Sequence, residues 1–344
     1  MKQRIRTVNL LLVIGIVLLG LFVIPLPYFV TKPGMAEPLE SHVKVEGAKD
    51  HTGEFMMTTV SMGRASIYTY LESFINPLYQ IYKKDEVMGN GETDEEYNFR
   101  QHLYMEDSKK SAIITAYRYA GKPYVISNNG VLVVAIVKDM PANGVLKVGD
   151  LIQKINGQPI HNAFDIKKIL QDSKPNSTFM LDIVRNNKPI RLNLKTAPFK
   201  KDPNHSGFGV SLLTNEILKS TPSVEIETEK IGGPSAGLMF TLEIYDQLVD
   251  GNLTKGYEVA GTGTIDEKGN VGAIGGISQK IAAASKAGAD IFFAPSENGA
   301  KNSNYNEAKK TVEKYHFKIK LVPVNSFKDA VQYLEKLPPE RKSG

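Results

Sequence analysis

The chain of 344 residues contains no cysteine and no tryptophan. The lack of cysteine excludes disulfide bonds, thiolate nucleophiles and thiolate metal sites, and it is compatible with an exported protein that has no disulfide framework. None of the six histidines lies in a His-Glu-X-X-His pattern or in another close ligand spacing. We therefore expect no zinc peptidase, no metal site and no other cofactor.

A phosphate-binding loop is also absent, because no Gly-X-X-X-X-Gly-Lys-Ser/Thr sequence occurs in the chain. We expect no bound nucleotide and no ATP-driven motor. The formal net charge of +5 is modest, and basic residues are interspersed with acidic ones. Nucleic-acid binding is therefore not expected either.

Charged residues are missing from Val8 to Ile24, which is mostly apolar and follows three basic residues. A run of this length can cross a bilayer, and the preceding positive charges place the N-terminus in the cytoplasm. A cleaved signal peptide is the alternative, but residues 24–28 offer no small-X-small cleavage site. We expect an uncleaved anchor in contact with membrane lipid, with the rest of the chain outside the cytoplasmic membrane of a bacterium.

Two glycine-rich motifs carry a serine and a lysine 45 residues apart. They are Gly232-Gly233-Pro234-Ser235-Ala236-Gly237 and Gly275-Gly276-Ile277-Ser278-Gln279-Lys280. A serine hydroxyl is a weak nucleophile at neutral pH, but a desolvated lysine can accept its proton. The pair predicts nucleophilic catalysis by Ser235 with Lys280 as its base.

The sequence after the serine predicts a helix, because apolar residues recur on one face and Pro234 suits a first helical position. Ser235 would then lie at a helix N-terminus. There the backbone around Gly233, Pro234 and Ala236 could stabilise an oxyanion. Each motif alone is also compatible with an ordinary helix cap, an anion-binding loop or a tight turn.

Both motifs lie between about Phe208 and Pro295, a segment that resembles the proteolytic domain of Lon-type serine-lysine peptidases. The resemblance implies that Ser235 attacks the peptide carbonyl and that Lys280 is the base. It also implies that Thr262, 18 residues before the lysine, orients it. The Thr262 hydroxyl could accept a hydrogen bond from Lys280, whereas the alternative is an ordinary strand threonine.

A second unit between about Gly121 and Pro198 resembles a PDZ domain of the bacterial protease type. Its pattern predicts strands over 131–137, 179–185 and 190–194, a helix over 163–171 and a tight hairpin at Asn156-Gly157.

PDZ domains bind extended peptides at a strand edge. In this chain the candidate peptide-binding residues are Asn129, Gly130, Val131, Phe164 and Ile166. The alternative for Ile166 is core packing, because Ile166, Ile169 and Leu170 form one helical stripe.

Residues 40–120 predict strands at 42–45 and 54–62 and helices at 68–82 and 95–120. We expect these strands to complete the peptidase sheet, so that the PDZ domain is an insertion. The fold class is α+β, a Lon-type proteolytic domain with an inserted, barrel-like PDZ domain after one transmembrane helix. The expected organisation is a cytoplasmic N-terminus (1–7), an anchor (8–28), a linker (29–40), the N-terminal part of the peptidase domain (41–117), the PDZ domain (118–198), the catalytic domain (199–338) and a tail (339–344).

Taken together, the chain resembles membrane-anchored, PDZ-containing Lon-like serine-lysine peptidases. The resemblance implies an ATP-independent serine endopeptidase that cleaves exported peptides or small membrane-tethered regulatory proteins, with the PDZ domain recruiting or gating substrate. One alternative is a non-catalytic PDZ scaffold at the membrane surface. The other is an anion- or nucleotide-binding module built on the glycine-rich loops.

Overall fold

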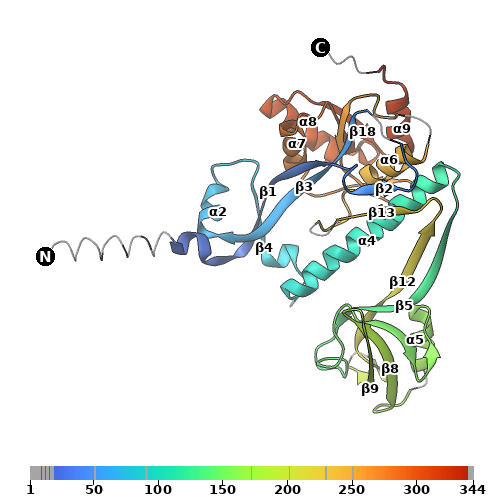
Figure 1. Cartoon of the computed structure of the whole chain (residues 1–344). Helices are drawn as coiled ribbons and strands as arrows, with labels where there is room; N and C mark the ends of the chain where they lie inside the picture. The colour runs from blue at the N-terminus through green and yellow to red at the C-terminus, as the bar shows by residue number, and fades with distance from the viewer. Residues whose placement is uncertain are drawn as a thin grey trace. The chain divides into compact units, whose positions relative to one another are not determined.

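The computed structural model describes residues 9, 12, 15, 19–49, 52–89, 92–171, 173–200, 202–228, 231–249 and 252–339. The chain divides into two compact units (Figure 1). The first comprises Met1–Glu92, Tyr104–Lys122 and Pro222–Gly344, and the second comprises Thr93–Leu103 and Pro123–Thr221. The second unit therefore interrupts the sequence of the first, as an inserted domain does.

The first unit is built on a mixed sheet, which has six strands in the described part of the chain. In spatial order the strands are β18 (Lys320–Val324), β17 (Ile291–Pro295), β14 (Glu258–Gly261), β3 (Glu54–Ser66), β1 (Pro25–Pro38) and β4 (Gln80–Lys83). Pairing is parallel from β18 to β3 and antiparallel from β3 to β4. Two short ladders join β2 (Val43–Val45) to β13 (Val224–Ile226) and β15 (Thr264–Ile265) to β16 (Val271–Gly272).

Helices cover both faces of this sheet. Those of the first unit are α2 (Ile67–Glu72), α3 (Lys84–Val87), α4 (Asp94–Tyr119, shared with the second unit), α6 (Gly237–Leu248), α7 (Ile277–Lys286), the 3₁₀ turn η1 (Glu297–Gly299), α8 (Asn304–Tyr315) and α9 (Phe327–Glu335). Neighbouring strand residues point to opposite faces. Accordingly, Ala260 packs in a core with α7 and α8, whereas Gly261 lies against Met239 of α6.

Of the two early strands predicted for the large sheet, only the one over 54–62 joins it; the one over 42–45 is β2, which pairs with β13 in a separate ladder. Strand β3 pairs with β14, which is about 200 residues away in sequence, so the predicted strand over 54–62 is confirmed and extends to Ser66. The helix predicted over 95–120 is α4. The helix predicted over 68–82 is wrong beyond Glu72, because a turn follows and residues 80–83 pair with β1 as β4.

The N-terminal segment differs from the prediction. Residues 25–38 form β1, so the predicted end of the anchor and most of the predicted linker are a strand of the sheet between β3 and β4. Residues 19–23 are helical, whereas residues 8, 10, 11, 13, 14 and 16–18 of the predicted anchor lie outside the described residues, as does most of the tail. Over the part of the chain that the structure describes, no helix combines the length and apolarity needed to cross a bilayer.

The second unit is a small antiparallel sheet with the helix α5 (Ala163–Leu170) and the start of α4. Its strands are β12 (Val210–Ser220), β5 (Tyr124–Ile136), β6 (Leu151–Ile155), β8 (Thr178–Arg185) and β9 (Lys188–Lys195) in spatial order, with β7 (Gln158–Pro159) paired to β6 and a separate pair of β10 (Ala197–Phe199) and β11 (Asp202–Gly207). The predicted hairpin at Asn156-Gly157 is confirmed, because both residues have positive φ between β6 and β7.

The boundary after the inserted unit lies at residue 221 rather than at 198. The reason is strand pairing, because β12 pairs with β5 from Val210 to Ser220. Residues 199–221, which the sequence assigned to the catalytic domain, therefore belong to the second unit.

Candidate active site

Ser235 and Lys280 meet in the first unit. The Lys280 Nζ lies 2.9 Å from the Ser235 Oγ and also donates a hydrogen bond of 2.6 Å to the carbonyl oxygen of Thr58 on β3. Ser235 is half-buried in the turn before α6, and Lys280 is on the first turn of α7 with only 3% of its surface exposed. The two glycine-rich motifs thus place a hydroxyl and an amine in direct contact.

The environment of Lys280 favours its neutral form. Burial lowers the pKa of Lys280 from its ordinary value of 10.5 to about 7, because the ammonium loses its hydration. A neutral amine has a lone pair that can accept the Ser235 hydroxyl proton while its own N–H bonds to the Thr58 carbonyl. The Thr58 hydroxyl in turn donates to the Gly261 carbonyl, which fixes β3 beside β14.

Thr262 contacts the serine rather than the lysine. Its hydroxyl donates a hydrogen bond of 2.9 Å to the Ser235 carbonyl, and the Gly263 N–H donates to the same oxygen at 2.9 Å. The predicted hydrogen bond from Lys280 to Thr262 is therefore replaced by one to Thr58. Thr262 is fully buried, and its hydrogen bond positions the backbone of Ser235. Sequence reasoning missed Thr58 because a backbone carbonyl leaves no residue-type signal.

Residues 231–236, here called the serine loop, carry Ser235 and are fixed by contacts with α4. The Ser108 hydroxyl of α4 donates to the Pro234 carbonyl at 3.0 Å. Helix α6 begins at Gly237 with Ala236 as its N-cap, so Pro234 is not the first helical residue and Ser235 precedes the cap. A Cβ on Gly237 would lie 2.8 Å from the Ser108 Oγ, which explains the glycine at this position.

Backbone donors surround the serine. Within the described residues, no acceptor is hydrogen-bonded to the N–H of Gly233 or of Ala236. Both groups are therefore available to an oxyanion formed at Ser235, and the start of α6 adds its positive dipole end. Pro234, the third predicted backbone contributor, has no N–H and cannot donate. Gly233 has a φ of 84°, a conformation that favours glycine.

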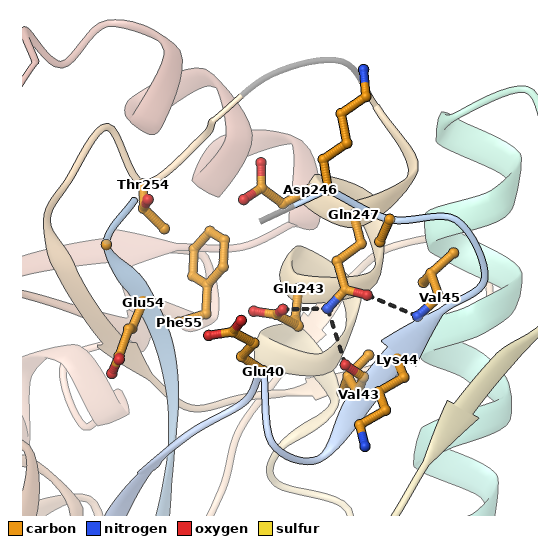
Figure 2. A pocket seen from close by; sticks show the side chains of 13 residues that line it. Glu40, Val43, Lys44, Val45, Glu54, Phe55, Glu243, Asp246, Gln247 and Thr254 are labelled. Carbon is orange, nitrogen blue, oxygen red and sulfur yellow. Dashed lines mark hydrogen bonds between the residues drawn. The ribbon is translucent and has the colours of Figure 1, made fainter. Parts of the chain in front are cut away.

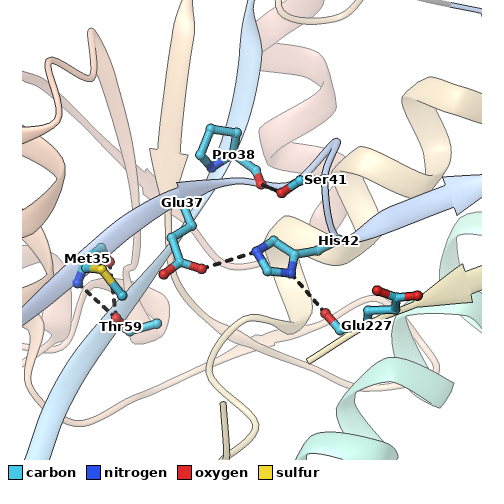
Figure 3. A network of polar contacts seen from close by, with 7 residues as sticks. All are labelled: Met35, Glu37, Pro38, Ser41, His42, Thr59 and Glu227. Carbon is cyan, nitrogen blue, oxygen red and sulfur yellow. Dashed lines mark hydrogen bonds and ion pairs between the residues drawn. The ribbon is translucent and has the colours of Figure 1, made fainter. Parts of the chain in front are cut away.

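Polar contacts tie the segment before the serine loop to β1 (Figure 3). His42 lies in the turn before β2, with its Nδ1 2.9 Å from the Glu227 carbonyl and its Nε2 3.1 Å from the Glu37 carboxylate. A carbonyl oxygen only accepts, so the Nδ1 carries a proton in this arrangement. On the neighbouring part of β1, the Met35 N–H donates to the Thr59 hydroxyl at 2.9 Å.

Helix α6 also borders a pocket of about 340 Å³, and neither Ser235 nor Lys280 lines it (Figure 2). Two buried carboxylates of the helix line it. Glu243 accepts a hydrogen bond of 2.6 Å from the Gln247 amide, and Asp246 accepts one of 2.8 Å from the Leu253 N–H. Burial raises the pKa of Glu243 to about 7; the Gln247 hydrogen bond opposes this shift, and the Asp246 carboxylate adds to it.

The shifted Glu243 predicts a pH-dependent stability. The folded chain binds the Glu243 proton more tightly than the unfolded chain, so the free energy of unfolding should fall as pH rises from 4.5 to about 7. A shift of this size corresponds to about 3 kcal/mol. Denaturant unfolding of wild type and Glu243→Gln at pH 4.5 and 7.5 measures it. The variant should lose about 3 kcal/mol less than wild type, and identical losses would contradict the shift.

The predicted peptide-binding residues take different positions in the second unit from those expected. Val131 and Ile166 are buried in its hydrophobic core, and Ile166 therefore follows the core-packing alternative. Asn129 and Gly130, predicted in a loop, lie within β5, while Phe164 is 69% exposed on α5. Of the five residues predicted to bind a peptide, Gly130, Val131 and Ile166 are thus buried, and Asn129 and Phe164 are exposed.

Strand β12 is one of the two edge strands of this sheet, and among the described residues its outer edge pairs with no other strand. It contacts α5, with the Ala163 N–H donating to the Thr214 hydroxyl at 3.2 Å. Gly209, directly before β12, has a φ of 81°. The sequence signal for this edge is the Gly207-Phe208-Gly209-Val210 motif, which the sequence analysis assigned to the other domain.

Two family models match separate parts of the chain. Residues 227–334 match the Lon protease (S16) C-terminal proteolytic domain, and residues 104–196 match the PDZ domain. The chain therefore combines a PDZ domain with a Lon-type proteolytic domain, and Ser235, Thr262 and Lys280 all lie within the Lon match. This match supports a serine peptidase.

Similar proteins cover separate parts of the chain. A Lon protease from Aster yellows witches'-broom phytoplasma (strain AYWB) is 31% identical over 97 residues, which is 28% of this chain and 11% of the relative. The chain thus matches about a tenth of the length of this curated relative.

The PDZ domain of an SdrC-like protein from Listeria monocytogenes is 28% identical, with 24% of this chain and 87% of that chain covered and a TM-score of 0.23. A solution structure from Geobacillus thermodenitrificans is 32% identical, with 24% and 95% covered and a TM-score of 0.22.

Proposed function

We propose that the protein is an ATP-independent serine endopeptidase in which Lys280 activates Ser235. The contact of 2.9 Å between the Lys280 Nζ and the Ser235 Oγ, with the lysine buried, is the observation that carries the proposal. A buried amine next to a hydroxyl, in front of free backbone N–H groups, is the arrangement that acyl transfer requires.

The reaction follows from these positions. The neutral Lys280 amine accepts the Ser235 proton as the Oγ attacks the carbonyl carbon of the substrate. The N–H groups of Gly233 and Ala236 bind the oxyanion, and the Lys280 ammonium then protonates the leaving amine as the peptide bond breaks. Water, deprotonated by Lys280, hydrolyses the acyl-enzyme and restores the serine hydroxyl.

Substrates would be extended segments of exported peptides or of small membrane-tethered regulatory proteins. Without a motor the enzyme cannot unfold a stable domain, so flexible segments are the accessible class. The PDZ domain would recruit or gate them by adding a peptide strand to the open edge of β12 beside α5. The apolar N-terminal run would anchor the chain in a bacterial cell membrane, with the catalytic and PDZ domains on the outer side.

Cleavage of an unstructured protein by the full chain, without ATP, tests this proposal. Wild type should release peptides that mass spectrometry identifies, and ATP should not change the rate. The Ser235→Ala variant is the matched control for contaminating proteases. A folded wild type that cleaves no unstructured protein or peptide would favour the alternative of a non-catalytic PDZ scaffold.

A further inference from the structure

Large apolar side chains gather on the surface where the chain enters the first unit. Phe74 is 70% exposed and Ile75 is 84% exposed, directly after α2. We call the following six exposed residues the apolar patch: Phe22, Ile24, Tyr68, Leu71, Phe74 and Ile75. An exposed apolar cluster of this kind marks a surface that binds either a membrane or another protein.

Ring contacts join the members of the patch that come from different segments. The Phe22 ring stacks on the Tyr68 ring of α2, with their centroids 4.7 Å apart. Tyr70 packs against Phe74 at 5.3 Å and against Tyr28 of β1 at 5.2 Å. Helix α2 and the end of the N-terminal helical segment therefore lie side by side (Figure 1).

The path of the chain determines what this surface faces. The uncharged run from Val8 ends at Ile24, and β1 begins at the next residue, Pro25. No linker separates the apolar run from the folded sheet. A bilayer that holds the run must therefore begin within a few residues of Ile24, which is itself part of the patch.

We propose that the apolar patch lies in the interfacial layer of the bilayer, so that α2 and the turn after it form a second membrane contact of the peptidase unit. This inference rests on the membrane anchor of the proposed function. The tyrosines suit this layer, because their rings are apolar and their hydroxyl groups reach water. The acidic Glu72 of α2 is half-buried and accepts a hydrogen bond from the Tyr79 hydroxyl. Two contacts, the anchor and the patch, would restrict rotation of the peptidase unit on the membrane.

The absence of cysteine allows a direct test with the full chain. An environment-sensitive fluorophore is attached to Ile75→Cys, and in a second sample to Lys309→Cys. Lys309 is exposed on α8, which packs against β17 and β18 at the other edge of the sheet, so it is the matched control. Both samples are reconstituted in vesicles of phosphatidylcholine and phosphatidylglycerol that carry a nitroxide lipid quencher. Flotation of the same vesicles measures whether the chain is anchored in the membrane, and peptide cleavage measures whether the enzyme is active.

The expected result is flotation of both samples, with quenching of the Ile75 probe and not of the Lys309 probe. Flotation without quenching at Ile75 would overturn the inference and leave the anchor intact. A chain that does not float would refute the anchor and the inference with it, while cleavage would still report the peptidase. An Ile75 probe that is shielded from a water-soluble quencher before vesicles are added would show a contact between copies instead.

Discussion

Replacement of Ser235 by alanine, or of Lys280 by methionine, is expected to lower kcat/KM for peptide cleavage by a factor of about 10⁴ or more, as for other residues that act as one catalytic unit. The Lys280 amine and the Ser235 hydroxyl are in direct contact, so either change removes the same step. The double variant should therefore be no slower than the single variants. Initial rates on a fluorogenic unstructured peptide measure all three.

Two further lysine variants sharpen this prediction. Lys280→Arg keeps the positive charge but cannot lose its proton at working pH, so it should be as inactive as Lys280→Met. Lys286→Ala changes an exposed lysine at the end of the same helix and should retain wild-type activity. An active Lys280→Arg enzyme would show that the lysine acts through its charge and not as a base.

The free energy of unfolding of Lys280→Met distinguishes the loss of a catalytic base from the loss of the folded structure. The lowered pKa of Lys280 means that the folded state disfavours the ammonium by up to about 5 kcal/mol below pH 7. Methionine removes this cost, although it leaves the Thr58 carbonyl without its donor, which costs about 1–3 kcal/mol. Inactive Lys280→Met should thus be at least as stable as wild type at pH 6. Inactivity with a large drop in stability would indicate a structural role.

The second large effect is the pH dependence of cleavage. The neutral amine is the active form of Lys280, and its pKa is about 7. Below that pH, kcat/KM should rise about tenfold per pH unit, and it should level off about one to two units above it. Rates of the full chain from pH 5 to 10 measure this profile, with circular dichroism at each pH as a check on folding. A flat profile across that range would contradict the assignment of Lys280 as the base.

The pH profile also distinguishes Lys280 from Glu243, which has a similar pKa of about 7. Glu243 lies on α6 and lines a pocket that neither Ser235 nor Lys280 lines. Glu243→Gln should therefore change the pH dependence of the free energy of unfolding and leave the pH dependence of kcat/KM unchanged. A profile that disappears in Glu243→Gln would move the rate-controlling titration from the lysine to this carboxyl group.

Local patterns were sufficient for much of the chain. The helices α4 and α5 and the Asn156-Gly157 hairpin follow from periodicity and turn chemistry over a few residues, and the structure has them within one or two residues. The pairing of Ser235 with Lys280 was predicted from two motifs, because a serine nucleophile needs a proton acceptor and a desolvated lysine can serve as one.

Contacts between distant residues decided the rest. The carbonyl oxygen that accepts a hydrogen bond from Lys280 belongs to Thr58, 222 residues away. This contact cannot be predicted from the threonine side chain, because the accepting atom belongs to the backbone. The lysine has a pKa near 7 only because the folded unit excludes water from it.

Strand pairing made Pro25–Pro38 part of the sheet and moved Val210–Ser220 to the PDZ unit, since hydrogen bonds between distant strands leave little trace in a local pattern. By itself, the sequence determined which groups we propose for the chemistry, because that proposal depends on residue type. The tertiary structure decided their protonation, their partners and the domain boundaries, because these depend on burial and on pairing across the chain.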